Sequence, residues 1–106
     1  MNTYQYTFQD KQAIIGHLAF LYKKQSLHVH DPSKIFQENQ YTNFSQMQAF
    51  IAYIDGALEL LEKEHKDILV RDFFQGKERN WWSSYYSKTT YYRIKSTAMN
   101  EFLRCL

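Results

Sequence analysis

Residues 87–103 read SKTTYYRIKSTAMNEFL, and at the helical repeat this stretch has two chemically different faces. Tyr91, Ile94, Ala98 and Phe102 are spaced three or four residues apart, so on a helix they share one side and are expected to pack inward. The opposite side is polar, which a helix that only packs against a core does not need. The stretch therefore predicts a helix that also presents a binding surface.

The polar face carries residue types that contact nucleic acids. Hydroxyl and basic side chains bind base edges and phosphates, and a helix N-terminus favours phosphate because of its dipole. Ser87 is placed to cap that N-terminus. The candidate DNA-binding residues on the helix are Lys88, Thr89, Thr90, Tyr92, Arg93 and Ser96, with Lys77, Arg79 and Lys95 as flanking phosphate contacts.

Two shorter helical segments are expected before this helix, KDILVRDFF (66–74) and NWWSSYY (80–86). Gly76 is placed to end the first, and Asn80 is placed to cap the second. A short helix, a tight turn and a longer helix that begins at a serine cap form a helix-turn-helix. We expect that arrangement in the C-terminal third of the chain.

The same stretch resembles the end of region 4, the DNA-binding C-terminal domain of sigma-70-type factors. It is more similar still to the ArpU-type phage and prophage regulators of late transcription, and small mollicute proteins end in a comparable way. Those regulators favour the run S-x-x-T-Y-Y-R-x-K-x-x-A-x-x-x-F, which here is Ser87, Thr90, Tyr91, Tyr92, Arg93, Lys95, Ala98 and Phe102. Where the family usually has an E-I-A-x-x-L-G helix, this chain has NWWSSYY. The resemblance covers about residues 50–104 and implies a transcription regulator that binds DNA, with RNA polymerase as a further partner.

The composition predicts one all-α domain. An apolar fraction of 44% with 18% aromatic residues excludes a disordered chain, and three glycines with one proline leave little material for a turn-rich β fold. We expect an N-terminal helical extension at 1–43, with a helix from about residue 8 to 27. Residues 44–106 are expected to hold a long helix, capped by Asn43 or Ser45, and the helix-turn-helix. Gly56 in that long helix suggests a close helix crossing, and LEKEHKD (61–67) is expected at its solvated end.

Charge is distributed unevenly along the chain. The net charge of +2 is too small to imply a nucleic acid by itself. Residues 1–70, however, hold six basic and eight acidic side chains, whereas 71–106 hold seven and three. The basic excess lies in the third of the chain that contains the predicted helix-turn-helix, where a polyanion would be bound.

The sequence also bears on the cellular compartment of the protein and on whether it is an enzyme. Cys105 is the single cysteine, the N-terminus does not resemble a signal peptide, and no apolar run reaches membrane-spanning length. We expect a cytoplasmic protein without membrane contact. No phosphate loop, nucleophile elbow or four-ligand metal pattern occurs, and His28 and His30 form only part of a metal site. We therefore expect neither an enzyme nor a cofactor or metal.

Two functions remain open from the sequence. In the first, the chain is a DNA-binding transcriptional regulator whose partners are double-stranded DNA and, as candidates, RNA polymerase and a second copy of the chain. In the second, it is a small helical adaptor that docks RNA polymerase or another assembly through NWWSSYYSKTTYY (80–92) without reading DNA. Trp81 and Trp82 are expected in the core, with base stacking as the alternative.

Overall fold

The computed structural model describes residues 5–30, 40–76 and 78–106, and these residues are helical with short connections, which confirms the all-α class. The helices are α1 (Phe8–His30), α2 (Gln40–Glu59), α3 (Lys63–Leu69) and α4 (Lys88–Arg104). A π-helical turn, η2 (Val70–Gln75), continues α3, and a 3₁₀ turn, η3 (Trp81–Ser84), precedes α4. In the sequence, Asp31, Pro32 and Ser33 predict a turn or helix start, and this stretch lies outside the described residues. The side chains of His28 and His30, considered above as part of a metal site, are also outside those described.

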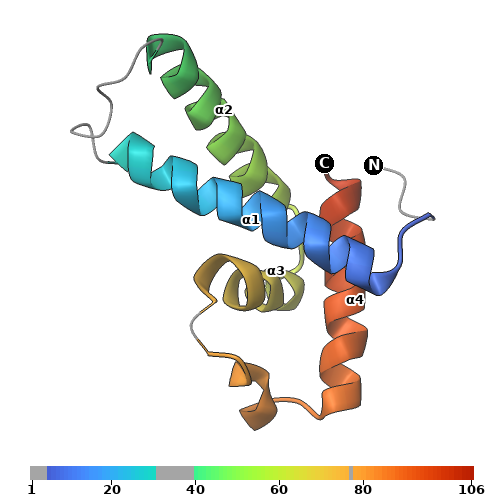
Figure 1. Cartoon of the computed structure of the whole chain (residues 1–106). Helices are drawn as coiled ribbons and strands as arrows, with labels where there is room; N and C mark the ends of the chain where they lie inside the picture. The colour runs from blue at the N-terminus through green and yellow to red at the C-terminus, as the bar shows by residue number, and fades with distance from the viewer. Residues whose placement is uncertain (1–4, 31–39, 77) are drawn as a thin grey trace.

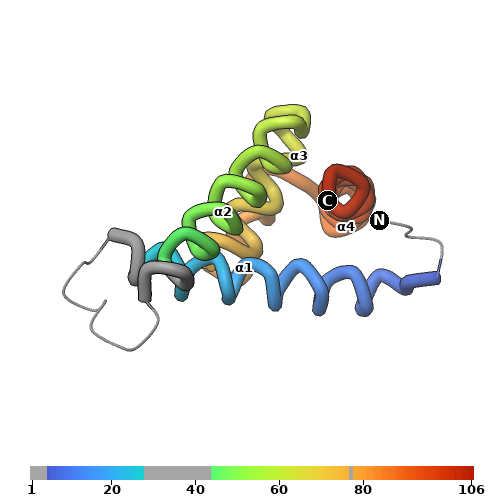
Figure 2. Tube along the Cα trace, turned by 90° about the horizontal axis from the view of Figure 1, so that it is seen from above, coloured from blue at the N-terminus to red at the C-terminus, as the bar shows by residue number. Residues whose placement is uncertain are grey.

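α1 is the element that joins the others. It contacts α2, η2 and α4, and α3 packs on α4. In Figure 1, α1 and α2 diverge from each other, and α1 passes in front of the middle and upper part of α4. Figure 2 looks along α4 and shows α1 running past its side. The N-terminal turns of α4, at the bottom of Figure 1 beside η3, extend beyond this crossing.

One core is shared by all four α-helices. Ala98 and Phe102 of α4 are fully buried, as the helical spacing predicts. Their neighbours in the core are Ile15 from α1, Ile54, Ala57 and Leu58 from α2, Leu69 from α3, and Met99 and Leu103 from α4. Residues 1–43 thus contribute part of the same core, because Ile15 and Ala19 are as buried as the C-terminal residues.

The limits of α2 differ from the prediction. It begins at Gln40, so neither Asn43 nor Ser45 is its cap. It ends at Glu59, where the amides of Leu60 and Leu61 donate to carbonyls three residues earlier and tighten the last turn. The segment LEKEHKD therefore does not end the long helix, since α3 begins within it at Lys63.

Gly76 and Gly56 differ in backbone conformation and in structural role. Gly76 adopts φ +58°, and its amide donates to the carbonyl of Arg71 at 3.1 Å. This left-handed residue ends η2, as predicted, because glycine has no Cβ to oppose that conformation. Gly56 is exposed, and a Cβ added to it would meet no atom within 4 Å. The predicted close helix crossing at Gly56 is therefore wrong for the described residues.

Candidate nucleic-acid interface

The candidate interface begins at the N-terminus of α4. Ser87 has extended φ and ψ angles of −68° and 160°, and its Oγ accepts from the amide of Thr90 at 3.2 Å. The Ser87 Oγ also donates to Thr90 Oγ1, at 2.9 Å. Ser87 is thus the N-cap, as predicted, and such a cap stabilises a helix by about 1 kcal/mol. It fixes the position at which the polar face begins.

The polar face of α4 is accessible over its first turns. Lys88, Thr89, Tyr92 and Arg93 are exposed, and Tyr92 keeps 42% of its surface while Tyr91 keeps 4%. This difference between adjacent tyrosines confirms the predicted helical phase. Arg79 is also exposed, in the loop before η3.

The other candidate DNA-binding residues on α4 are less accessible than these four. Thr90 is half-buried and is engaged by the Ser87 cap. Ser96 is half-buried further along α4. Ile94, which was expected to pack inward, is only half-buried, because the centre of the inward face lies one residue later. Lys77 lies outside the described residues.

The position of Lys95 differs from its predicted role as a phosphate contact. It is 7% exposed, and its Nζ lies 3.1 Å from the Asp72 Oδ2 and 5.0 Å from the centre of the Phe73 ring. Position 95 is four residues after Tyr91 and three before Ala98, so it belongs to the inward face. Its ammonium group is engaged by a buried carboxylate, and Lys95 is not a phosphate contact in this structure.

Asp72 organises the interior of the site. Its carboxylate accepts from the indole Nε1 of Trp81 at 2.6 Å and from the hydroxyl of Tyr91, and it pairs with Lys95. The Asp72 and Lys95 side chains are each 9% exposed. Donors from η3 and α4 therefore converge on one carboxylate of η2. Burial and the hydrogen bond to Asp72 raise the pKa of the Tyr91 hydroxyl, so it stays a donor across the physiological range.

Sequence reasoning missed the role of Asp72. The signal was present as an acidic residue inside the apolar run ILVRDFF, since a carboxylate in a buried segment must find donors. Its partners could not be found in the same way. Trp81, Tyr91 and Lys95 lie 9 to 23 residues away in sequence, and only the folded chain brings them together.

The two tryptophans line the same ring cluster. Trp82 stacks on Tyr91 with ring centres 4.5 Å apart and planes 10° apart, and Trp81 meets Tyr91 edge-on at 6.3 Å. Both indoles are half-buried and pack against Tyr91, so neither lies in the core, where they were expected. The segment before α4 forms a single 3₁₀ turn of four residues, in the place where the family resemblance implies a full helix. Asn80 makes no side-chain cap there.

The start of α1 borders the interface on a second side. Phe8 meets Tyr92 edge-on with ring centres 5.9 Å apart, and Lys11 Nζ donates to Asn100 Oδ1 at 2.7 Å. These contacts place the start of α1 against α4 from Tyr92 onward. Lys88, Thr89 and Arg93 remain exposed beside this crossing.

Comparison of the chain with protein-family models, with curated proteins and with solved structures finds no match. Among the described residues, no helix is both long and apolar enough to cross a membrane. In the same part of the chain, histidine, cysteine, aspartate and glutamate do not gather in groups of three that could hold a metal ion.

Proposed function

We propose that this chain is a DNA-binding transcriptional regulator that presents the first turns of α4 to duplex DNA. The observation that carries the proposal is the uncovered, serine-capped N-terminus of α4, on which Lys88, Thr89, Tyr92 and Arg93 are exposed together. These side chains stand in the basic third of the chain. The resemblance to sigma region 4 adds RNA polymerase as a second partner of the same proposal.

The exposed residues take different roles under this proposal. Lys88, Arg93 and Arg79 bind phosphates and set the position of the helix, because ion pairs with the DNA backbone carry no sequence information. Thr89 and Tyr92 approach base edges in the major groove, whose width admits one helix. Two copies of α4 in a homodimer would read half-sites about one helical turn apart.

Duplex binding with a salt titration tests the proposal. A pool of random AT-rich duplexes is titrated with the protein, and binding is followed by fluorescence anisotropy at several salt concentrations. Binding that weakens steeply with salt is expected, with a log–log slope of about −0.9 for each phosphate contact. An absence of binding at low salt would refute the regulator.

An adaptor role without DNA readout is the second candidate. It is favoured by η3, which replaces a full helix, and by Tyr85, which keeps 66% of its surface exposed next to α4. Chemical labelling of tyrosines separates the two functions. Protection of Tyr92 by duplex DNA supports the regulator, whereas protection by purified RNA polymerase alone supports the adaptor.

A further inference from the structure

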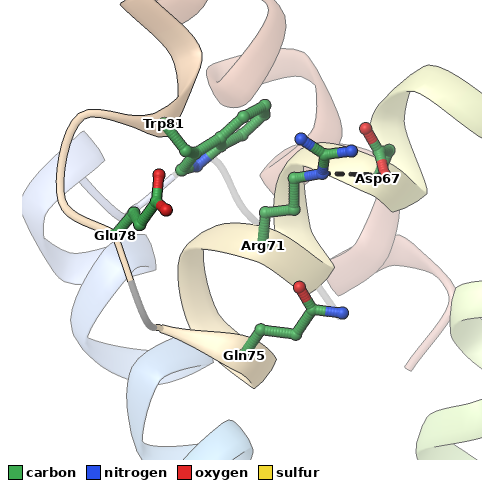
Figure 3. A pocket seen from close by; sticks show the side chains of 5 residues that line it. All are labelled: Asp67, Arg71, Gln75, Glu78 and Trp81. Atoms are coloured by element: carbon green, nitrogen blue, oxygen red, sulfur yellow. Dashed lines mark ion pairs between the residues drawn. The ribbon is translucent and has the colours of Figure 1, made fainter.

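A groove of about 350 Å³ opens beside η2. It is lined by Asp67, Arg71, Gln75, Glu78 and Trp81. In Figure 3 the guanidinium of Arg71 lies to the right of the Trp81 indole, with Asp67 beside it at the right and Glu78 at the left of the view. The DNA-binding proposal uses none of these five residues.

The groove already holds one guanidinium of the chain itself. Arg71 lies 4.9 Å from the centre of the Trp81 ring and 5.7 Å from that of Tyr85, and its Nε is 3.3 Å from Asp67 Oδ1. Asp67 therefore matches the charge of Arg71. Among the described residues, Glu78 takes part in no ion pair, and the charged side chains that line the groove, Asp67, Arg71 and Glu78, sum to a charge of −1.

The Trp81 ring, which forms the aromatic wall of the groove, is held in place by contacts within the chain. The Trp81 indole donates to the buried Asp72 at 2.6 Å and packs edge-on against Tyr91. Tyr85 extends this wall at the surface, with ring centres 6.3 Å from Trp81. A rigid aromatic wall loses little conformational entropy when it is covered, which favours binding.

We propose that this groove docks an arginine side chain of a protein partner. A guanidinium is planar, stacks on aromatic rings, and pairs with a carboxylate through two parallel hydrogen bonds. Glu78 supplies the carboxylate, the Gln75 side-chain carbonyl supplies a further acceptor, and Trp81 and Tyr85 supply the rings. A nucleic acid does not suit this groove, because its phosphates would be repelled by Glu78 and Asp67. The proposal is independent of DNA binding by α4.

Short peptides test this docking site. The full chain, labelled with ¹⁵N, is titrated with acetyl-Gly-Arg-Gly-amide and with the citrulline peptide, which has the same shape without the charge. The indole N–H signal of Trp81 is monitored and is assigned with a Trp82→Phe variant. A saturable shift with the arginine peptide is expected, with affinity about fivefold higher than for citrulline, as one exposed ion pair provides.

Two matched variants complete the test. Glu78→Gln is expected to remove the preference for arginine over citrulline, whereas Glu62→Gln, the same change at an exposed residue outside the groove, is expected to keep it. Equal shifts with both peptides, or no shift of the Trp81 signal, would overturn the arginine site. Tighter binding of acetyl-Gly-Glu-Gly-amide would overturn it as well, because Arg71 would then be the binding group. If the salt titration shows that the protein does not bind duplex DNA, the expected results of these peptide titrations remain the same.

Discussion

At the scale of single residues, Asp72 decides how α4 lies against the chain before it. Its carboxylate accepts from Trp81 and Tyr91 and pairs with Lys95, so η2, η3 and α4 meet at one buried charge. A buried carboxylate that lacked these donors would be costly. The orientation of the exposed face of α4 therefore depends on a residue that does not itself reach the surface of that face.

Replacing Asp72 is expected to destabilise the protein strongly. Asp72→Asn leaves the Lys95 ammonium buried without its counter-charge, which costs about 3–5 kcal/mol by comparison with other broken buried pairs. Asp67→Asn, the matched control, breaks an exposed pair with Arg71 and is expected to cost about 0–1 kcal/mol. Urea unfolding of the three proteins measures both changes. Equal stability of the two variants would show that the Asp72 cluster does not hold the fold.

Tyr22 gives the protein a sensitivity to alkaline pH. Burial, together with the hydrogen bond that its hydroxyl donates to Asp55 at 2.7 Å, raises the pKa of Tyr22 to about 12. The folded state thus keeps the proton at pH values where the unfolded chain, with a tyrosine pKa of about 10, has released it. The contribution of Tyr22 to stability is complete below about pH 10 and declines as the pH rises towards 12.

A Tyr22→Phe variant checks this pH dependence. At pH 7 it is expected to be less stable than the wild type by about 1 kcal/mol, the typical value of one hydrogen bond. The difference should narrow between pH 10 and 12, where the wild type loses this contribution. Thermal unfolding at a series of pH values gives the comparison. A difference that stays constant up to pH 12 would mean that the Tyr22 pKa is not raised.

At the scale of elements, two glycines have opposite roles, one at the end of a helix and one inside a helix. The left-handed Gly76 ends η2 and begins the loop to η3, whereas Gly56 sits in the middle of α2 with open space around it. The same substitution should therefore act in opposite directions at the two sites. Gly76→Ala is expected to destabilise by about 1 kcal/mol, and Gly56→Ala is expected to stabilise by up to about 1 kcal/mol. Midpoints of urea unfolding that move in the same direction for both variants would contradict these assignments.

The predictable features of the fold are local ones. The 3.6-residue period revealed the buried face of α4, the Ser87 cap marked its start and Gly76 marked the end of η2, since each of these depends on residues close in sequence. The break between α2 and α3 lacked such a marker, because no glycine or proline separates Glu59 from Lys63. Of the site, the exposed residues of α4 followed from the period. The inward position of Lys95 also follows from the period, but its ion-pair partner does not, because Asp72 lies 23 residues away in sequence.

At the scale of the whole molecule, exposed acidic side chains predominate on α2 and α3, and exposed basic side chains predominate on α4. The exposed acidic residues Asp55, Glu59, Glu62, Glu64 and Asp67 belong to α2, α3 and the turn between them. Exposed basic residues stand at Arg79, Lys88 and Arg93, around the start of α4, although Glu78 is exposed beside Arg79 and Lys63 is an exposed basic residue of α3. Such a division orients a protein towards a polyanion before contact, and the effect weakens with salt. Under the DNA-binding proposal, α4 is directed at the duplex by charge before any base is read.

The most direct test of DNA binding through α4 compares two double variants in the salt titration. Lys88→Ala/Arg93→Ala removes the two basic side chains of the exposed face. Lys24→Ala/Arg104→Ala removes the same charge from exposed sites elsewhere, and Arg104 lies about 24 Å from Lys88 along α4. The first variant is expected to bind duplex more weakly, with a log–log salt slope shallower by about 1.8, while the control retains most of the affinity. A folded Lys88→Ala/Arg93→Ala protein that binds duplex as tightly as the wild type, with the same salt slope, would contradict DNA binding by this helix.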